Sequence, residues 1–195
     1  MKWYNTNEKS IISFFCGGIK MPERPEVIKM RENAHDRNYV LENVSKEGGL
    51  LDYAGDEMKD DREIALTAVH NNPEALEYVS DRLKADREIV YDSVSEVGWT
   101  YCYAKENLLN DKELLMAGLK KTGQILYFAS PEMRDDKEVV MLAATNKPII
   151  IKFASGRLRE DKEIGLSAMK SNKNCYEFLG PNLKQDEDIL EIMNG

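Results

Sequence analysis

The stretch Asp61-Arg62-Glu63-Ile64-Ala65-Leu66 decides the fold, because close copies of it return along the chain at a fixed spacing. The copies begin at positions 61, 86, 111, 136 and 161, so successive start numbers differ by 25 each time, and weaker copies begin at Asp36 and Asp186. A fixed period in this range is typical of a solenoid, in which each unit buries its apolar face against its neighbours. The sequence therefore predicts an all-α protein, a right-handed or gently curved α-solenoid of short helix pairs with a 25-residue repeat.

Each repeat carries its own helix start signal. With the opening Asp counted as place one, that Asp is a strong helix N-cap, and the Glu at place three puts a negative charge in the first turn. Apolar residues at places four, five, eight and nine line one helix face, as in Ile64, Ala65, Ala68 and Val69. Place eight is small in the five central copies, which lets a neighbouring helix approach closely; its residues are Ala68, Ser93, Gly118, Ala143 and Ala168.

The second half of each repeat is predicted to form a second helix. Place thirteen holds glycine or proline in five of the six complete copies, which suits a helix end followed by a new first turn. The linker that follows carries bases such as Lys84 and Arg159, and we expect them to form a solvated, weakly paired rim with the next opening Asp and Glu. An aromatic residue stands at place eighteen in every complete copy and is interpreted as a stack of core aromatics: Tyr53, Tyr78, Tyr103, Phe128, Phe153 and Phe178.

The two ends of the array depart from the repeat. Residues 1–35 are predicted to be an irregular N-terminal cap, with one short helix after the capping residues 5–8 and a second beginning at Pro25. Residues 36–185 make six tandem helix-pair repeats, and residues 186–195 make a half-repeat that caps the C-terminal end. There Glu191 stands at place six, where preceding copies hold large apolar or aromatic residues, so the outer face of this last helix is expected to meet water.

The repeated pattern resembles a known family, the tandem helical repeats of domain of unknown function 4116. The residues that carry the resemblance are the Asp-Lys/Arg-Glu-Val/Ile opening with its Ala-containing apolar helix, as in residues 136–144, and the Tyr-Phe-Ala-Ser segment at residues 127–130. The resemblance covers Asp36 to Gly195. It implies an all-helical repeat and supplies no catalytic residue. Three residues depart from the pattern, namely Asn38 in place of an acid, Gly165 inside a helix and Lys173 at a turn position.

Composition argues against several classes of partner and location. The net charge is −8, and acidic and basic residues are interleaved in every repeat, so binding to nucleic acid or to an anionic membrane is not expected. The apolar run at residues 11–19 is too short to span a bilayer, and no small-residue cleavage site follows it. Three scattered cysteines indicate reduced thiols and a cytoplasmic location.

Residues with catalytic or metal-binding chemistry do not form a recognisable motif. His35 and His70 lie outside any metal or protease spacing, and no activating base accompanies Cys102 in the sequence. The recurring Asp and Glu occupy capping places in every copy, whereas a catalytic site occurs once. We therefore expect a protein that is not an enzyme and has no cofactor or metal. The alternative is a hydrolase or transferase whose site is assembled from residues of several repeats.

The unrepeated outward positions are the candidates for binding. Places fourteen and seventeen lie three apart on one outward face of the second helix and vary from copy to copy. On successive repeats, they predict an apolar patch inside a charged rim, the usual form of a protein-binding site. Trp99 lies near the edge of the apolar arc, so it belongs either to this surface or to the core. The predicted partner is a protein, with self-association as one form, and the predicted binding residues are Trp99, Tyr127, Ile149, Lys152, Glu74 and Glu77.

Overall fold

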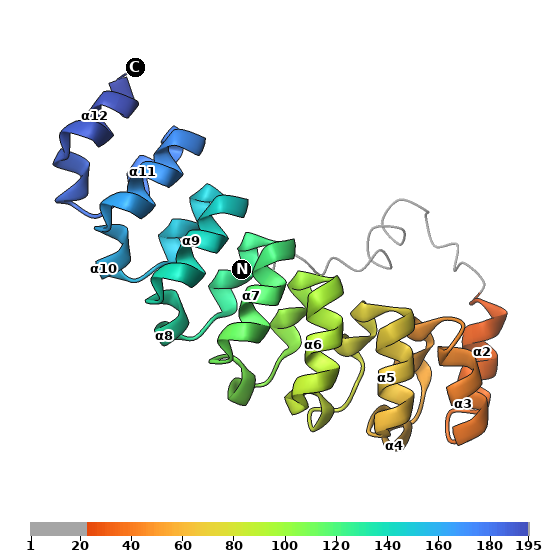
Figure 1. Ribbon diagram of the computed structural model, residues 1–195. Helices are drawn as coiled ribbons and strands as arrows, with labels where there is room; N and C mark the ends of the chain where they lie inside the picture. The colour runs from red at the N-terminus through yellow and green to blue at the C-terminus, as the bar shows by residue number, and fades with distance from the viewer. Residues whose placement is uncertain (1–22, 195) are drawn as a thin grey trace.

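The computed structural model describes residues 23–194, and within that range all regular secondary structure is helical. Figure 1 shows the repeats side by side in one gently curved row, from α2 and α3 at one end to α12 at the other. The predicted all-α solenoid with a 25-residue repeat is confirmed. The short helix expected after residues 5–8 lies outside the described residues, whereas α2 (Pro25–Glu32) begins at the proline that the sequence indicated.

The opening helix of each repeat follows its capping aspartate directly. The Asp61 carboxylate accepts hydrogen bonds from the backbone N–H groups of Glu63 and Ile64, at 2.9 and 3.2 Å, which satisfies two donors of the first turn. The helices that begin this way between residues 36 and 194 are α3 (Arg37–Val44), α5 (Arg62–Asn71), α6 (Arg87–Glu96), α7 (Lys112–Lys121), α9 (Lys137–Asn146), α11 (Lys162–Ser171) and α12 (Glu187–Asn194).

The second element of each repeat is a 3₁₀ helix of five or six residues, where the sequence predicted a helix of unspecified type. Only six positions separate place thirteen from the end of the apolar segment, and a 3₁₀ helix spans them in two turns. Lys173 opens its helix as the prolines and glycines do, so the departure at this position is tolerated. The elements are η1 (Gly48–Tyr53), η2 (Pro73–Glu77), η4 (Gly98–Tyr103), η6 (Gly123–Phe128), η7 (Pro148–Phe153) and η8 (Lys173–Phe178).

Single helical turns link one repeat to the next. In three linkers the turn is α-helical and in three it is 3₁₀, within the described part of the chain. Each buries or half-buries one apolar residue, such as Leu83 or Met133, beneath the neighbouring helices. These turns are α4 (Asp56–Lys59), η3 (Leu83–Ala85), η5 (Glu106–Leu108), α8 (Pro131–Arg134), α10 (Gly156–Arg159) and η9 (Leu183–Gln185).

The core lies between a layer of α-helices and a layer of 3₁₀ helices, and it is continuous along the row. Places four, five, eight and nine of the α-helix and places fifteen and sixteen of the 3₁₀ helix point into it. At place thirteen the two layers approach so closely that glycine is needed in three repeats. A Cβ atom added to Gly98 would lie 2.4 Å from the backbone oxygen of Gly118 on the next helix, and Gly48 and Gly123 make the same approach.

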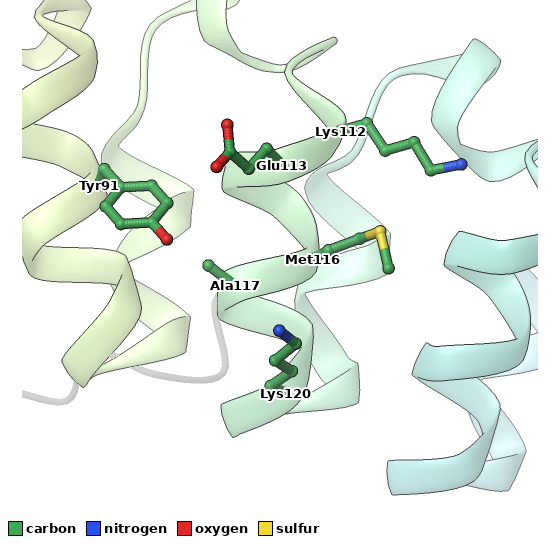
Figure 2. A pocket seen from close by; sticks show the side chains of 6 residues that line it. All are labelled: Tyr91, Lys112, Glu113, Met116, Ala117 and Lys120. Carbon is green, nitrogen blue, oxygen red and sulfur yellow. The ribbon is translucent and has the colours of Figure 1, made fainter.

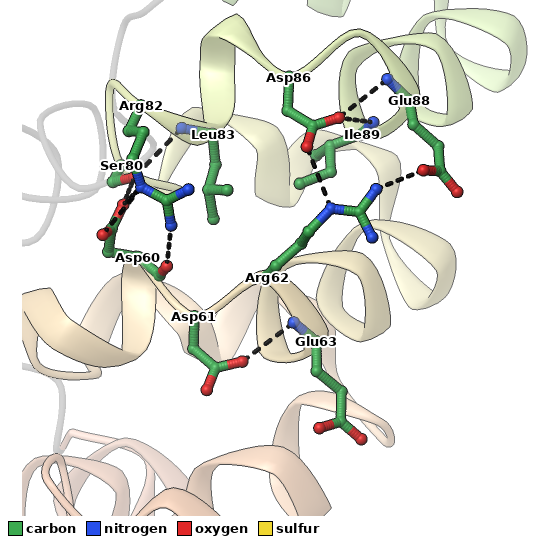
Figure 3. Close-up of polar contacts among 10 residues, drawn as sticks. All are labelled: Asp60, Asp61, Arg62, Glu63, Ser80, Arg82, Leu83, Asp86, Glu88 and Ile89. Carbon is green, nitrogen blue, oxygen red and sulfur yellow. Dashed lines mark hydrogen bonds and ion pairs between the residues drawn. The ribbon is translucent and has the colours of Figure 1, made fainter.

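A ladder of ion pairs joins consecutive repeats along the α-helix N-termini. The base at place two reaches forward to the acids at places one and three of the next repeat. Arg62 pairs with Asp86, Nε to Oδ2 at 3.1 Å, and with Glu88 (Figure 3). The same arrangement holds for the place-two bases of the other complete repeats, which are Arg37, Arg87, Lys112, Lys137 and Lys162.

The expectation that linker bases such as Lys84 and Arg159 form a solvated rim with the next opening Asp and Glu is wrong. Lys84 is half-buried and donates from Nζ to the backbone oxygen of Glu77 at 2.7 Å, and the Nε of Arg159 is buried without a hydrogen-bond partner among the described residues. The linker base points inward because its backbone runs beside the 3₁₀ layer. The opening Asp and Glu are paired by the base at place two of the preceding repeat instead. Other linker bases are exposed and pair with an acid of the preceding linker, as Arg82 does with Asp60 at 3.0 Å and Arg157 with Asp135 at 3.1 Å.

Candidate functional site

The outer surface of the 3₁₀ layer carries a row of partly exposed aromatic side chains. Places fourteen, seventeen and eighteen supply them, because places fifteen and sixteen are turned into the core. The two variable places are three apart, and residues three apart are eclipsed in a 3₁₀ helix, so they share one outward face. We call this surface the aromatic face and define it by Trp99, Tyr103, Tyr127, Phe128, Phe153 and Phe178.

The rings of the aromatic face contact one another across repeats. Tyr127 lies with its ring centroid 5.0 Å from that of Phe128 and 4.9 Å from that of Phe153, in edge-to-face geometry in both cases. Trp99 makes the same type of contact with Tyr103, at 5.5 Å. Edge-to-face pairs at these distances are favourable. The contact between Tyr127 and Phe153 joins η6 to η7, so part of the surface is continuous over two repeats.

The sequence-predicted binding residues lie on this face with different degrees of exposure. Trp99 is 38% exposed and Tyr127 is 56% exposed, whereas Ile149 is half-buried. Lys152 is exposed, with its Nζ 4.8 Å from the ring centroid of Phe153 and 6.0 Å from that of Phe178. Glu74 is exposed on η2. Of the two interpretations of Trp99, the structure matches the surface one, because more than a third of its area remains accessible.

The interpretation of place eighteen as a stack of core aromatics is wrong for Phe128, whereas the aromatics of the other five copies pack against the edge of the core. Phe128 is 43% exposed, and the aromatics at the other copies of this place, such as Tyr53 and Tyr78, are only half-buried. The 3₁₀ helix ends at or just before place eighteen, so this side chain stands at the margin of the layer. Places fifteen and sixteen already fill the core beneath it. The short interval between place thirteen and the linker is the sequence signal that could have indicated this.

Carboxylates gather on the first two repeats, beside the N-terminal end of the aromatic face. Burial raises the pKa of the Tyr78 hydroxyl, and the charges of Glu77, Asp52 and Glu74 raise it further, which places all three carboxylates near one phenol. Burial and a hydrogen bond to Glu77 also raise the pKa of Tyr103. The surface beside this end of the aromatic face is therefore acidic.

The thiol on this face is not activated. Burial raises the pKa of Cys102 to about 11, and the nearby charge of Glu77 acts in the same direction. A thiol with that pKa is almost wholly protonated near neutrality, whereas the thiolate is the nucleophile. Lys84 is close to Tyr103, with Nζ 5.8 Å from the ring centroid, and burial lowers the pKa of its ammonium group.

A concavity lies on the layer of α-helices, between α6 and α7. It has a volume of about 440 Å³, and Figure 2 shows Tyr91 of α6 facing the side chains of α7. Two of its three charged residues already have partners, since Lys112 pairs with Asp136 at 2.8 Å and Glu113 pairs with Arg87 at 2.5 Å. The full lining is Tyr91, Lys112, Glu113, Met116, Ala117 and Lys120.

Residues 23–194 contain no group of three or more His, Cys, Asp or Glu side chains placed to hold a metal ion. Among the helices of that same range, none has the length and apolar character needed to cross a membrane.

Comparison with known proteins identifies the repeats. The family model described as domain of unknown function (DUF4116) matches three times in tandem, at residues 36–84, 86–134 and 136–192. The first two matches each begin at a capping aspartate and span two 25-residue repeats, and the third extends into α12. The comparison with curated proteins found no match, and the comparison with solved structures found none. Because the three matches cover most of the chain, it belongs to the DUF4116 family of tandem helical repeats.

Proposed function

We propose that this protein is a non-catalytic protein-binding module and that the aromatic face is its docking surface. The observation that carries the proposal is the position of Tyr127, which is 56% exposed and in contact with two further rings on two repeats. Exposed aromatic anchors surrounded by charged residues are characteristic of protein-binding sites. Rings that already contact one another lose little conformational freedom when a partner covers them.

Packing within the repeat does not require these aromatic residues. Place fourteen holds Trp99 in one copy but Glu74, Gln124 and Asn174 in others, and each of those repeats forms the same 3₁₀ helix. Burying a large aromatic side chain is favourable by several kcal/mol at most, and an exposed ring gains only part of this. The proposal therefore assigns Trp99 and Tyr127 to recognition of another protein.

A non-catalytic function agrees with the state of the reactive groups in the described structure. The recurring carboxylates cap helices and pair with bases of the preceding repeat, as Asp86 does with Arg62. The Cys102 thiol has a raised pKa. The alternative function is that of a hydrolase or transferase whose site is assembled from several repeats. The observation that would support it is a cavity into which several unpaired polar side chains converge.

Affinity capture from a native lysate tests the proposed function. The bait is the full chain, as wild type and as a variant in which Trp99, Tyr127 and Ile149 are all replaced by alanine. The matched control replaces three exposed residues of the opposite layer, Lys120, Thr145 and Lys170, by alanine. We expect the first variant to lose partners that the wild type and the control both retain. Equal recovery by all three baits contradicts the proposal, provided that circular dichroism shows the same helical content.

We also place the module in the cytoplasm. The support is the sparse cysteine content, with Cys102 and Cys175 present as free thiols in the structure. Cell fractionation tests this location, and recovery with an extracytoplasmic fraction contradicts it.

A further inference from the structure

Across repeats two to five, the outer surface of the 3₁₀ layer carries acidic residues on one side of the aromatic centre and a basic residue on the other. Repeat two carries Glu74 and Glu77, which lie close to Tyr78. Repeats three and four carry the apolar centre, with Trp99 and Tyr127. Repeat five carries Lys152 over its own aromatic residue. Read along the row, the face is acidic, aromatic, aromatic and cationic.

Two outer charges of this surface, those of Glu74 and Lys152, lack counter-ions among the described residues, which distinguishes them from the charges of the ladder. Every place-two base between residues 36 and 185 pairs with two acids of the next repeat. By contrast, the Glu74 carboxylate and the Lys152 ammonium make no ion pair with any residue that the structure describes. Charges that have been left unpaired beside exposed rings are available to a partner, and they favour a partner of complementary sign at each end.

A charge sequence that reverses sign about an apolar centre is complementary to itself. In an isologous dimer, a two-fold axis brings the same patch of both copies together in opposite directions. With the axis between repeats three and four, repeat two of one copy faces repeat five of the other. Glu74 then meets Lys152 of the second copy, and Trp99 meets Tyr127. We infer that a second copy of this chain docks on the aromatic face and forms an antiparallel homodimer; this inference rests on the proposed function.

The dimensions of the face predict a reversible dimer. Repeats two to five extend over about 35–40 Å if neighbouring helices are spaced by about 8–10 Å, and a helix with its side chains is about 10–12 Å wide. The contact area is then about 350–480 Å² per copy, below the roughly 800 Å² of a typical stable interface. Repeats one and six add no ion pair, because this register places Asp52 opposite Asn174 of the second copy and Gly49 opposite Glu177. The dimer should therefore dissociate on dilution.

Sedimentation equilibrium with charge reversal tests the inference. The full chain is compared as wild type, Glu74→Lys, Lys152→Glu and the double variant that carries both substitutions. Each single reversal places like charges opposite each other in both symmetry-related contacts, and we expect it to weaken association by about tenfold or more. The double variant restores opposite signs and should associate within about threefold of the wild type. Lys120→Glu makes the same charge change on the opposite layer, so it serves as the control and should leave association unchanged.

The outcomes separate this inference from the proposed function. A wild type that stays monomeric up to about 1 mM overturns the dimer, as does a double variant that associates no better than the single reversals. The proposed function falls only if the alanine variants of the aromatic face capture the same proteins as the wild type. A monomeric wild type whose partners are lost on replacing Trp99 and Tyr127 leaves the docking surface in place and assigns it to a different protein.

Discussion

Replacement of Gly98 by alanine tests how closely the two helical layers must approach. Gly98 opens η4 and lies against the backbone of α7, where an added Cβ would stand 2.4 Å from the Gly118 oxygen and 3.0 Å from the Cβ of Lys121. Real Cβ atoms essentially never come within 3.0 Å of another heavy atom. The oxygen belongs to the helix backbone, so it cannot turn aside as the end of a flexible side chain would. The two layers must move apart.

The expected cost follows from two opposing effects. Overpacking a closely packed region costs typically about 1–3 kcal/mol, and a backbone clash of this depth belongs at the upper end of that range. Replacing a glycine by alanine stabilises the folded protein by about 0.4–1 kcal/mol, because it reduces the conformational entropy of the unfolded chain. We expect Gly98→Ala to lower the free energy of unfolding by about 2 kcal/mol, with the loss concentrated in α6, η4 and α7.

Urea unfolding followed by circular dichroism measures the overall effect, and hydrogen exchange locates it. A loss of about 2 kcal/mol corresponds to a drop in the urea midpoint of about 1 M at a slope of about 2 kcal/mol per M. Gly156→Ala is the matched control, because no atom lies within 4 Å of its added Cβ, and it should be neutral or slightly stabilising. A Gly98→Ala protein as stable as the wild type, or one no worse than Gly156→Ala, would refute the reasoning about layer contact.

Three further predictions concern single side chains. The hydrogen bond from the Arg37 guanidinium lowers the pKa of Asp61, so this carboxylate stabilises the fold above its unfolded pKa of about 3.9, and the contribution is lost as pH falls through the lower folded pKa. Because added salt screens the pairing, acid unfolding of the wild type should begin at a lower pH without added salt than with it, and equal onset pH values contradict the pairing. Peptide mapping after alkylation at pH 8 should show Cys102 reacting far more slowly in the folded than in the urea-unfolded protein, and equal rates contradict its raised pKa of about 11. Tyr101→Phe should cost about 1 kcal/mol in urea unfolding, because its hydroxyl donates to a linker carbonyl at 3.1 Å from a fully buried ring, whereas a comparable cost for exposed Tyr127→Phe would contradict this explanation.

The repeat architecture was predictable because its signals act locally. Each capping aspartate satisfies the donors of its own first turn, and the apolar spacing of Ile64, Ala65, Ala68 and Val69 defines a helix face without reference to the rest of the chain. Seven such starts in one register leave little choice of fold. Gly165 and Lys173 depart from the pattern, and the helices at those positions form nonetheless, because neighbouring repeats pack against them.

The misses concern contacts between repeats, which local signals do not specify. The place-two bases reach acids 24 and 26 residues away, as Arg37 does with Asp61 and Glu63. Their sequence signal was present in every repeat, since a base at place two always precedes acids at those two distances. The exposure of Phe128 depends on where the 3₁₀ helix ends, and on how far places fifteen and sixteen fill the core.

Site-specific photocrosslinking tests the role of the aromatic face most directly. A benzophenone-bearing phenylalanine replaces Tyr127 on the 3₁₀ layer in one protein and Lys120 on the α-helical layer in the other, and both are irradiated in the native lysate. We expect crosslinks to protein, including a second copy of the chain, from position 127 and only background from position 120. Crosslinks of equal yield from both positions, or from position 120 alone, would contradict the assignment of this face as the docking surface.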